Sequence, residues 1–258
     1  VELYDNLVYV ILHFPTNKIK EGKKSAEQEI DFIIGENFLI TVRYDTIGPI
    51  HEFSKLFESR SILKKEKMAT HGGYIFVQMM KELYKDSLIQ LDELTKTVKE
   101  IEYYIFNGQE ANMVKKISQT SRKLLDFKQA VRFHRDILNS YEIASTRLFG
   151  TDYGYYANLV TSEFNKVNSL LESNRDALSE LQRTNDSLLS TQTNDIMKTF
   201  TIMTFVMMPL TIITGIFGMN TSDNLTFIEN KNDFFFVIGA MMITGLVMFL
   251  FFKLRKWL

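Results

Sequence analysis

The chain has 258 residues, which is long enough to bury a sizeable core in one domain or in two small ones. Its 30 basic and 31 acidic residues give a formal net charge of −1, which argues against a nucleic-acid binder that relies on a general positive field. It has no cysteine, so disulfides, cysteine-based zinc sites and a cysteine nucleophile are excluded. Because the chain starts at Val1 and its opening residues already have a strand pattern, we expect an N-terminal piece of the natural protein to precede it.

The first fifty residues alternate as β-strands do. One apolar run covers Leu7–Phe14, and residues 29–44 hold two more runs separated by Gly35-Glu36-Asn37, a typical hairpin turn. The segment between the first two runs is polar and predicts an exposed loop. Together these patterns predict a small sheet.

The apolar period then becomes helical, first over residues 50–60 and then over two long segments, 74–106 and 111–149. The first long segment is rich in acid and the second in base. Two long helices joined by a short turn should fold back as an antiparallel hairpin, with opposite charges on facing or neighbouring surfaces. The alternative for each charged pair is a simply solvated face.

A third helix is predicted to start near Thr151 or Asp152, and it carries an apolar stripe with spacings of three and four residues. The stripe contains Phe164, Val167, Leu171, Leu178, Leu181 and Leu188, with Asn174 and Asn185 in the same seam. Asparagine in such a seam can fix the register of a parallel coiled coil, which favours self-association. An internal core face that packs on the preceding hairpin explains the stripe equally well.

Two stretches without charge, 199–218 and 234–252, are each long enough to span a hydrocarbon core of roughly 30 Å as a helix. Basic residues flank the pair at Lys198 and within 253–256, whereas the connecting loop is mostly acidic. Positively charged flanks stay on the cytoplasmic side. We therefore expect a membrane hairpin with both termini in the cytoplasm.

The first span has a regular polar face. Its members are Met197, Thr201, Thr204, Met208, Thr211 and Gly215, and Asn194 extends the face by one turn. Lipid offers hydroxyl groups no partner, so such a face meets another helix or water, although threonine can also bond back to its own helix. Because the face continues the seam of the preceding helix, we expect several copies to line a pore with it.

At "MPLTIITGIFGMN" the sequence resembles the CorA-type family of divalent-cation channels and transporters, whose signature is Gly-Met-Asn at the outer end of the first of two spans. The resemblance extends over nearly the whole chain, from "FLITVR" through "NDIMK" to the basic "KWL" ending. It implies an α+β membrane protein, a funnel-shaped homopentamer in which a stalk helix runs into the pore-lining span. The implied segments are a cytoplasmic α/β domain with the helix pair (1–150), a stalk (151–198), the first span (199–218), an extracytoplasmic loop (219–233), the second span (234–252) and a basic cytoplasmic tail (253–258).

The resemblance also implies the site residues. The outer entrance would be Gly218, Met219 and Asn220, the hydrophobic gate Met197, Phe200 and Met208, and the polar lining Asn194, Thr201, Thr204 and Thr211. The family often has a smaller aliphatic residue where Phe200 stands. The loop after Gly-Met-Asn lacks the family's usual acidic motif, which leaves Asp223 and Glu229 as candidates for attracting cations outside.

The implied function is passage of Mg²⁺, with Co²⁺ or Ni²⁺ as further cargo, down the electrochemical gradient through a cell membrane. Magnesium gives up its first-shell water reluctantly, so neutral oxygens that hold the hydrated ion suit fast passage. Intracellular Mg²⁺ is also the expected regulator, at carboxylates that the sequence does not place. No phosphate-binding loop is present, so we expect no nucleotide, no organic cofactor and no enzyme activity.

Two alternatives stay open. The same architecture could transport Zn²⁺ or another divalent metal, although the four histidines (His13, His51, His71 and His134) show no paired ligand spacing. A two-span membrane sensor or scaffold is the second alternative, but the outer loop is too short for a ligand-binding domain.

Overall fold

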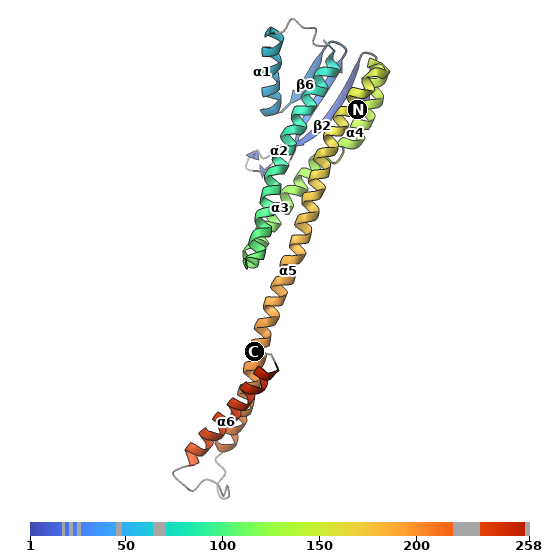
Figure 1. The fold of residues 1–258 in the computed structure, drawn as a ribbon. Coiled ribbons are helices and arrows are strands. Elements are labelled where there is room, and N and C mark those ends of the chain that lie inside the picture. The colour runs from blue at the N-terminus through green and yellow to red at the C-terminus, as the bar shows by residue number, and fades with distance from the viewer. Residues whose placement is uncertain are drawn as a thin grey trace. The chain divides into compact units, whose positions relative to one another are not determined.

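The computed structural model describes residues 1–16, 19–20, 23–24, 27–44, 48–63, 71–218 and 233–255 (Figure 1). By compactness the chain divides into two units, Val1–Asn185 and Asp186–Leu258. The first unit contains the sheet and most of the helices. The elements in chain order are β1 (Glu2–Leu3), β2 (Leu7–Pro15), β3 (Ile19–Lys20), β4 (Lys23–Lys24), β5 (Glu27–Gly35), β6 (Leu39–Arg43), α1 (Gly48–Leu63), α2 (Gly72–Phe106), α3 (Glu110–Val131), α4 (His134–Phe149), the 3-10 turn η1 (Thr151–Tyr153), α5 (Gly154–Gly218) and α6 (Asp233–Leu254).

The main sheet has the strand order β1-β2-β5-β6, and every neighbouring pair is antiparallel. Alternation along the strands gives it one buried apolar face, which α2, α3 and α4 cover. That face carries Val8, Val10, Leu12, Phe14, Ile30, Phe32 and Ile34. The predicted strands and the turn at Gly35-Glu36-Asn37 are confirmed. The predicted loop between the first two runs is partly wrong, because β3 and β4 form a short ladder of their own there.

The start of α2 is pressed against the hairpin turn of the sheet. The Gly72 amide donates to the Glu36 carbonyl at 2.6 Å, and a Cβ at Gly72 would meet the carbonyl oxygens of Phe38 and Gly35. Only glycine leaves room for this close approach between two backbones. The turn therefore fixes where α2 begins.

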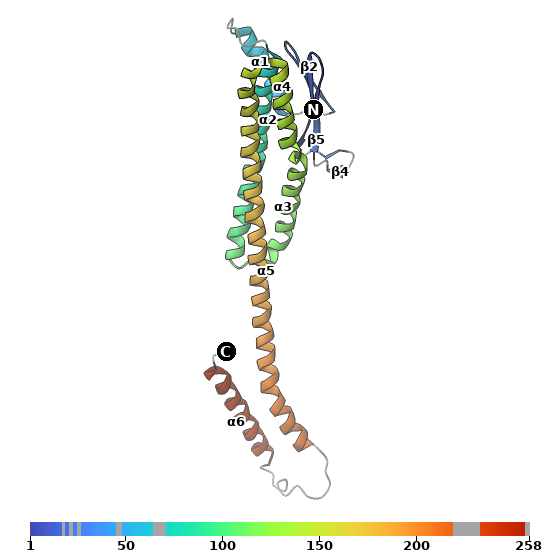
Figure 2. The ribbon, with the colours of Figure 1, turned by 90° about the vertical axis from the view of Figure 1, so that its right-hand side faces the viewer.

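The long helix pair folds back as predicted, with α2 and α3 packed along each other (Figure 2). Of the ion pairs between described side chains, one joins the two helices, Lys116 Nζ to Glu100 Oε1 at 2.6 Å. The other pairs on α2 lie within that helix, at Glu82–Lys85 and Asp92–Lys96. Among the described side chains, opposite charges therefore pair between α2 and α3 at one position. Most of the other charged side chains of the two helices lie on solvated faces.

The prediction of a single helix over 111–149 is wrong, because α3 ends at Val131 and α4 begins at His134. The His134 ring is buried, with Nε2 at 2.8 Å from the His13 carbonyl of β2 and Nδ1 at 2.9 Å from the Tyr84 hydroxyl of α2. Because a carbonyl only accepts, Nε2 carries the hydrogen and Tyr84 donates to Nδ1. Burial lowers the pKa of His134 to about 4, so the ring is neutral near pH 7. These two hydrogen bonds fix the position of the chain between the end of α3 and the start of α4.

The long helix α5 starts after the turn η1, close to the predicted start. Tyr153 of η1 donates its hydroxyl hydrogen to the Gly73 carbonyl at 2.7 Å and receives a bond from the Tyr141 hydroxyl, also at 2.7 Å. Both rings are buried. This chain of hydroxyls joins α4, η1 and the first turn of α2.

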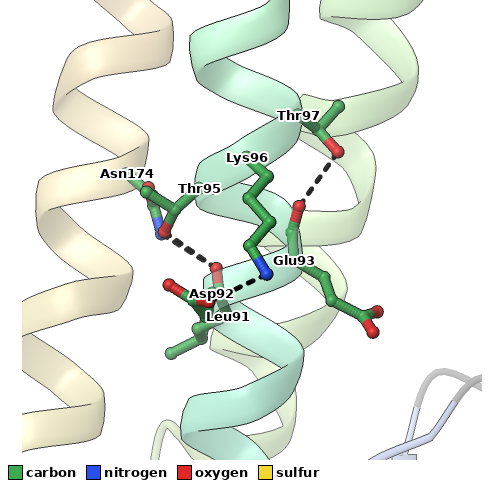
Figure 3. A network of polar contacts seen from close by, with 7 residues as sticks. All are labelled: Leu91, Asp92, Glu93, Thr95, Lys96, Thr97 and Asn174. Atoms are coloured by element: carbon green, nitrogen blue, oxygen red, sulfur yellow. Dashed lines mark hydrogen bonds and ion pairs between the residues drawn. The ribbon is translucent and has the colours of Figure 1, made fainter.

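The seam of α5 packs inside its own unit. Most of its apolar members are buried, and Asn174 Nδ2 lies 2.9 Å from Thr95 Oγ1 and 3.4 Å from the Leu91 carbonyl of α2 (Figure 3). The interpretation of the seam as a core face is therefore confirmed for this stretch. Asn185 is the last buried residue of the seam, and its Oδ1 has no hydrogen-bond partner among the described residues.

Candidate functional site

The second unit consists of the later part of α5 together with α6. Two helical stretches, Thr151–Gly218 and Phe235–Leu254, are long and apolar enough to cross a membrane by length and composition. Only about 6% of the apolar window of each is buried in the chain. In a soluble core helix that window would be mostly buried, so these helices have the character of membrane spans.

One face of α5 in this unit is covered by α6. Ile202 is buried, and Val206, Leu210 and Ile213 are partly buried on the same face, with spacings of three and four residues. On α6 the covered side includes Met248 and Phe252. The two helices therefore pack along these faces as a hairpin.

The polar stripe predicted from the sequence lies on the opposite face of α5. At 100° per residue, Met197, Thr201 and Met208 lie about 100–140° from Ile202. The centre of the whole stripe lies roughly 180° from the centre of the face formed by Ile202, Val206, Leu210 and Ile213. The side chains of Met197, Thr201 and Met208 are exposed, as are those of Thr204 and Thr211. The structure thus brings these residues together on one uncovered face.

The threonine hydroxyls of the stripe donate to their own helix. Thr201 Oγ1 lies 2.8 Å from the Met197 carbonyl, Thr204 Oγ1 3.0 Å from the Phe200 carbonyl, and Thr211 Oγ1 3.0 Å from the Met207 carbonyl. A hydroxyl has one hydrogen and two acceptor lone pairs. Because the helix takes the hydrogen, each oxygen can only accept from whatever occupies the space beside the stripe.

The structure describes some of the other predicted site residues and not the rest. Asn194 and Phe200 are exposed on α5, and Gly218 is its last residue. Met219, Asn220, Asp223 and Glu229 lie outside the described residues. Within the described ranges, no three His, Cys, Asp or Glu side chains gather closely enough to hold a metal ion.

One feature of this unit was missed in the sequence. A cavity of about 430 Å³ lies beside the hairpin, lined by Phe205 of α5 and by Met248, Phe251, Phe252 and Arg255 at the end of α6. The signal that could have indicated it is the cluster of phenylalanines directly before the basic ending. Because α6 is apolar on every side, periodicity alone does not say which of them face α5.

These features define a two-span membrane protein whose first span continues a long helix of an α/β unit. The sequence model of the family described as "CorA-like Mg2+ transporter protein" matches residues 1–256. The cobalt/magnesium transport protein CorA of Thermotoga maritima is 24% identical over 261 residues, covering all of this chain and 72% of the relative.

Solved structures agree with this match. The complete CorA magnesium transporter of Methanocaldococcus jannaschii superposes with a TM-score of 0.83 at 20% identity, covering 98% of this chain and 78% of that one. The soluble domain of CorA from the same organism gives 0.58 at 18% identity over 72% of each chain. The chain belongs to the CorA-like Mg²⁺ transporter family. The predicted family resemblance is confirmed, and the family consists of membrane transporters rather than enzymes.

Proposed function

We propose that several copies of this chain surround a water-filled path for hydrated Mg²⁺, with the stripe on α5 as its wall. The observation that carries the proposal is the position of this stripe, exposed on the face opposite α6. A single hairpin cannot enclose a pore, so the wall needs further copies of itself. The family resemblance favours five copies arranged as a funnel.

The chemistry of the stripe suits a cation that keeps its water. Water bound to Mg²⁺ points its hydrogens outward, and the stripe threonines offer oxygens that can only accept. Strong carboxylate ligands at the same place would hold the ion too long for fast release. The proposed wall therefore contacts the hydrated ion without removing its water.

At the outer end, Gly218, Met219 and Asn220 form the proposed entrance, where the Asn220 amide holds the hydrated ion. Asp223 and Glu229 are the proposed outer charges that attract cations. Entry into the cytoplasm is driven by the membrane potential, about 2.3 kcal/mol per charge per 100 mV and about twice that for a divalent ion.

At the inner end, rings of Met197, Phe200 and Met208 form the proposed hydrophobic gate. Each of these side chains is more than half exposed in the single chain, so copies placed around an axis can bring them together. Apolar rings of this kind close a path by dewetting. Intracellular Mg²⁺, bound by acidic groups between subunits, is the proposed signal for closure.

The topology follows the charge of the flanks. We place residues 1–198 and the basic tail 253–258 in the cytoplasm, with 219–233 outside and both spans in the cell membrane. Within the cytoplasmic part, we keep 1–150 as the α/β domain and 151–198 as the stalk.

The test is magnesium uptake into liposomes that contain the purified full chain and a magnesium-sensitive dye. We expect potential-driven uptake by the parent and its loss in Asn220→Ala, with Asn224→Ala in the same loop as the matched control. Uptake that Asn220→Ala leaves unchanged would overturn the entrance assignment. Parallel runs with Zn²⁺, Co²⁺ and Ni²⁺ rank the cargo, and absence of any divalent flux would favour a scaffold.

A further inference from the structure

The cavity beside the membrane hairpin combines an apolar lining with one charge. Three phenylalanines and a methionine form its wall, and among the described residues that line it Arg255 alone is charged. Its volume of about 430 Å³ falls within the range of roughly 300–1,000 Å³ that is typical of ligand pockets. A ligand that fills it must therefore be apolar along most of its length and polar or anionic at one end.

The lining residues of the cavity span less than the thickness of one leaflet of a bilayer. Met248 precedes Arg255 by seven residues, which is about 10 Å along a helix. Phe205 follows Lys198 by the same number of residues on the other helix. The cavity thus extends from the level of the basic flanks about 10 Å into a hydrocarbon core whose half-thickness is about 15 Å.

The Arg255 guanidinium is available to an anion. It lies 5.9 Å from the centre of the Phe251 ring, and no described carboxylate forms an ion pair with it. A guanidinium forms paired, charge-assisted hydrogen bonds with phosphate. The Phe251 ring is close enough for a weak cation–π attraction, and both residues line the cavity.

We propose that this cavity binds one anionic phospholipid, with an acyl chain against Phe205 and Met248 and the headgroup phosphate on Arg255. Charge complementarity and depth favour a lipid over the apolar helix of a second copy, which would leave Arg255 without a partner. The site does not depend on which ion the protein transports. Bound lipid would stabilise the inner end of the hairpin at the level of the proposed gate.

Native mass spectrometry of the full chain, purified in a neutral detergent, tests the proposal by counting lipid adducts. Neutral detergent removes the surface potential of an anionic membrane, which attracts basic tails without a specific site. We expect phosphatidylglycerol to bind in preference to phosphatidylcholine. Arg255→Gln should reduce that preference about tenfold, the loss expected for one charge-assisted hydrogen bond.

Two further variants separate the site from general attraction. Lys253→Gln removes a charge from the same tail but not from the cavity lining, so the preference should persist. Met248→Trp fills the cavity and should remove adducts of both lipids, while the mass of the intact assembly reports folding in the same spectrum. Equal losses in Lys253→Gln and Arg255→Gln, or no preference in the parent, would overturn the proposal. Displacement of the lipid by glycerol phosphate would show that the acyl chain does not contribute to binding, and it would overturn that part of the proposal.

Discussion

The two units of this chain differ in where their polar side chains find partners. In Val1–Asn185 several buried polar side chains bond to distant parts of the same chain, as His134 does to His13 and Tyr84, and Asn174 to Thr95. Others in that unit, such as Ser87 and Thr120, bond back to their own helix. In Asp186–Leu258 the threonines bond to the turn just before them and leave their oxygens exposed. The distant bonds of the first unit are made within one chain, whereas the second unit leaves a surface that lipid, water or another copy must meet.

The largest expected effect lies in the second unit, at the proposed gate. Met208→Ser replaces an exposed apolar side chain by a polar one, so water should enter the closed path more easily. We expect sustained magnesium flux into liposomes at internal concentrations that close the parent. Met242→Ser on α6, at a methionine that is also more than half exposed in the single chain, is the matched control. A Met208→Ser channel that still closes would argue against a hydrophobic gate here.

The next prediction concerns how the stability of the first unit depends on pH. The pKa of His134 is lowered by burial to about 4, below its ordinary 6.5, so the fold favours the neutral ring. Its contribution to stability is therefore complete above pH 6.5 and is lost as the pH falls towards 4. The loss is about 2 kcal/mol by pH 5 and about 3 kcal/mol in full.

The measurement is thermal unfolding of the full chain in detergent at pH 7.5 and pH 5. His134→Gln keeps a hydrogen-bonding side chain but cannot titrate, so its unfolding temperature should fall less between the two pH values. His51→Gln changes an exposed histidine on α1 and should follow the parent. Identical acid sensitivity in His134→Gln and the parent would show that other groups control this transition.

A smaller effect is expected at the buried tyrosine pair. Tyr153→Phe removes the hydroxyl that accepts from Tyr141 and donates to Gly73. Leaving the Tyr141 hydroxyl buried without its partner should cost about 2 kcal/mol. Chemical denaturation measures this loss, and Tyr155→Phe, at a residue that is 67% exposed, should change stability little. Equal results for the two variants would contradict the stabilising role assigned to the buried bonds of Tyr153.

The smallest effect is expected at Asn174. In Asn174→Leu the Leu91 carbonyl keeps its bond from Thr95, so few groups are left unpaired and stability should change by less than about 1 kcal/mol. The decisive readout is the oligomeric state by light scattering, which should match that of the parent. A changed number of subunits would show that this part of the seam contacts another copy.

The contrast between the units also explains how much could be predicted from the sequence. Strands, helix α2 and the stripe on α5 follow from local periodicity, which needs only neighbouring residues. The break before His134 has no glycine or proline to mark it. It depends on bonds to residues 121 and 50 positions away, which no local pattern contains.

For the candidate site, the spacing of Met197, Thr201 and Met208 predicts a shared face, but not what lies on the opposite side. The covering of α5 around Ile202 depends on α6, whose uniform apolar character hides its contact face. The seam shows the same limit. Its spacing permits two partners for Asn174, and only the folded chain provides Thr95 beside it.

The hydroxyl orientation in the stripe has a consequence for anions. Each threonine has already donated its only hydrogen, so a chloride ion beside the stripe would meet oxygen lone pairs and no donor. A hydrated cation instead turns water hydrogens towards the same oxygens. If the stripe lines a pore as we propose, such a surface would favour cations over anions without a tight binding site for either.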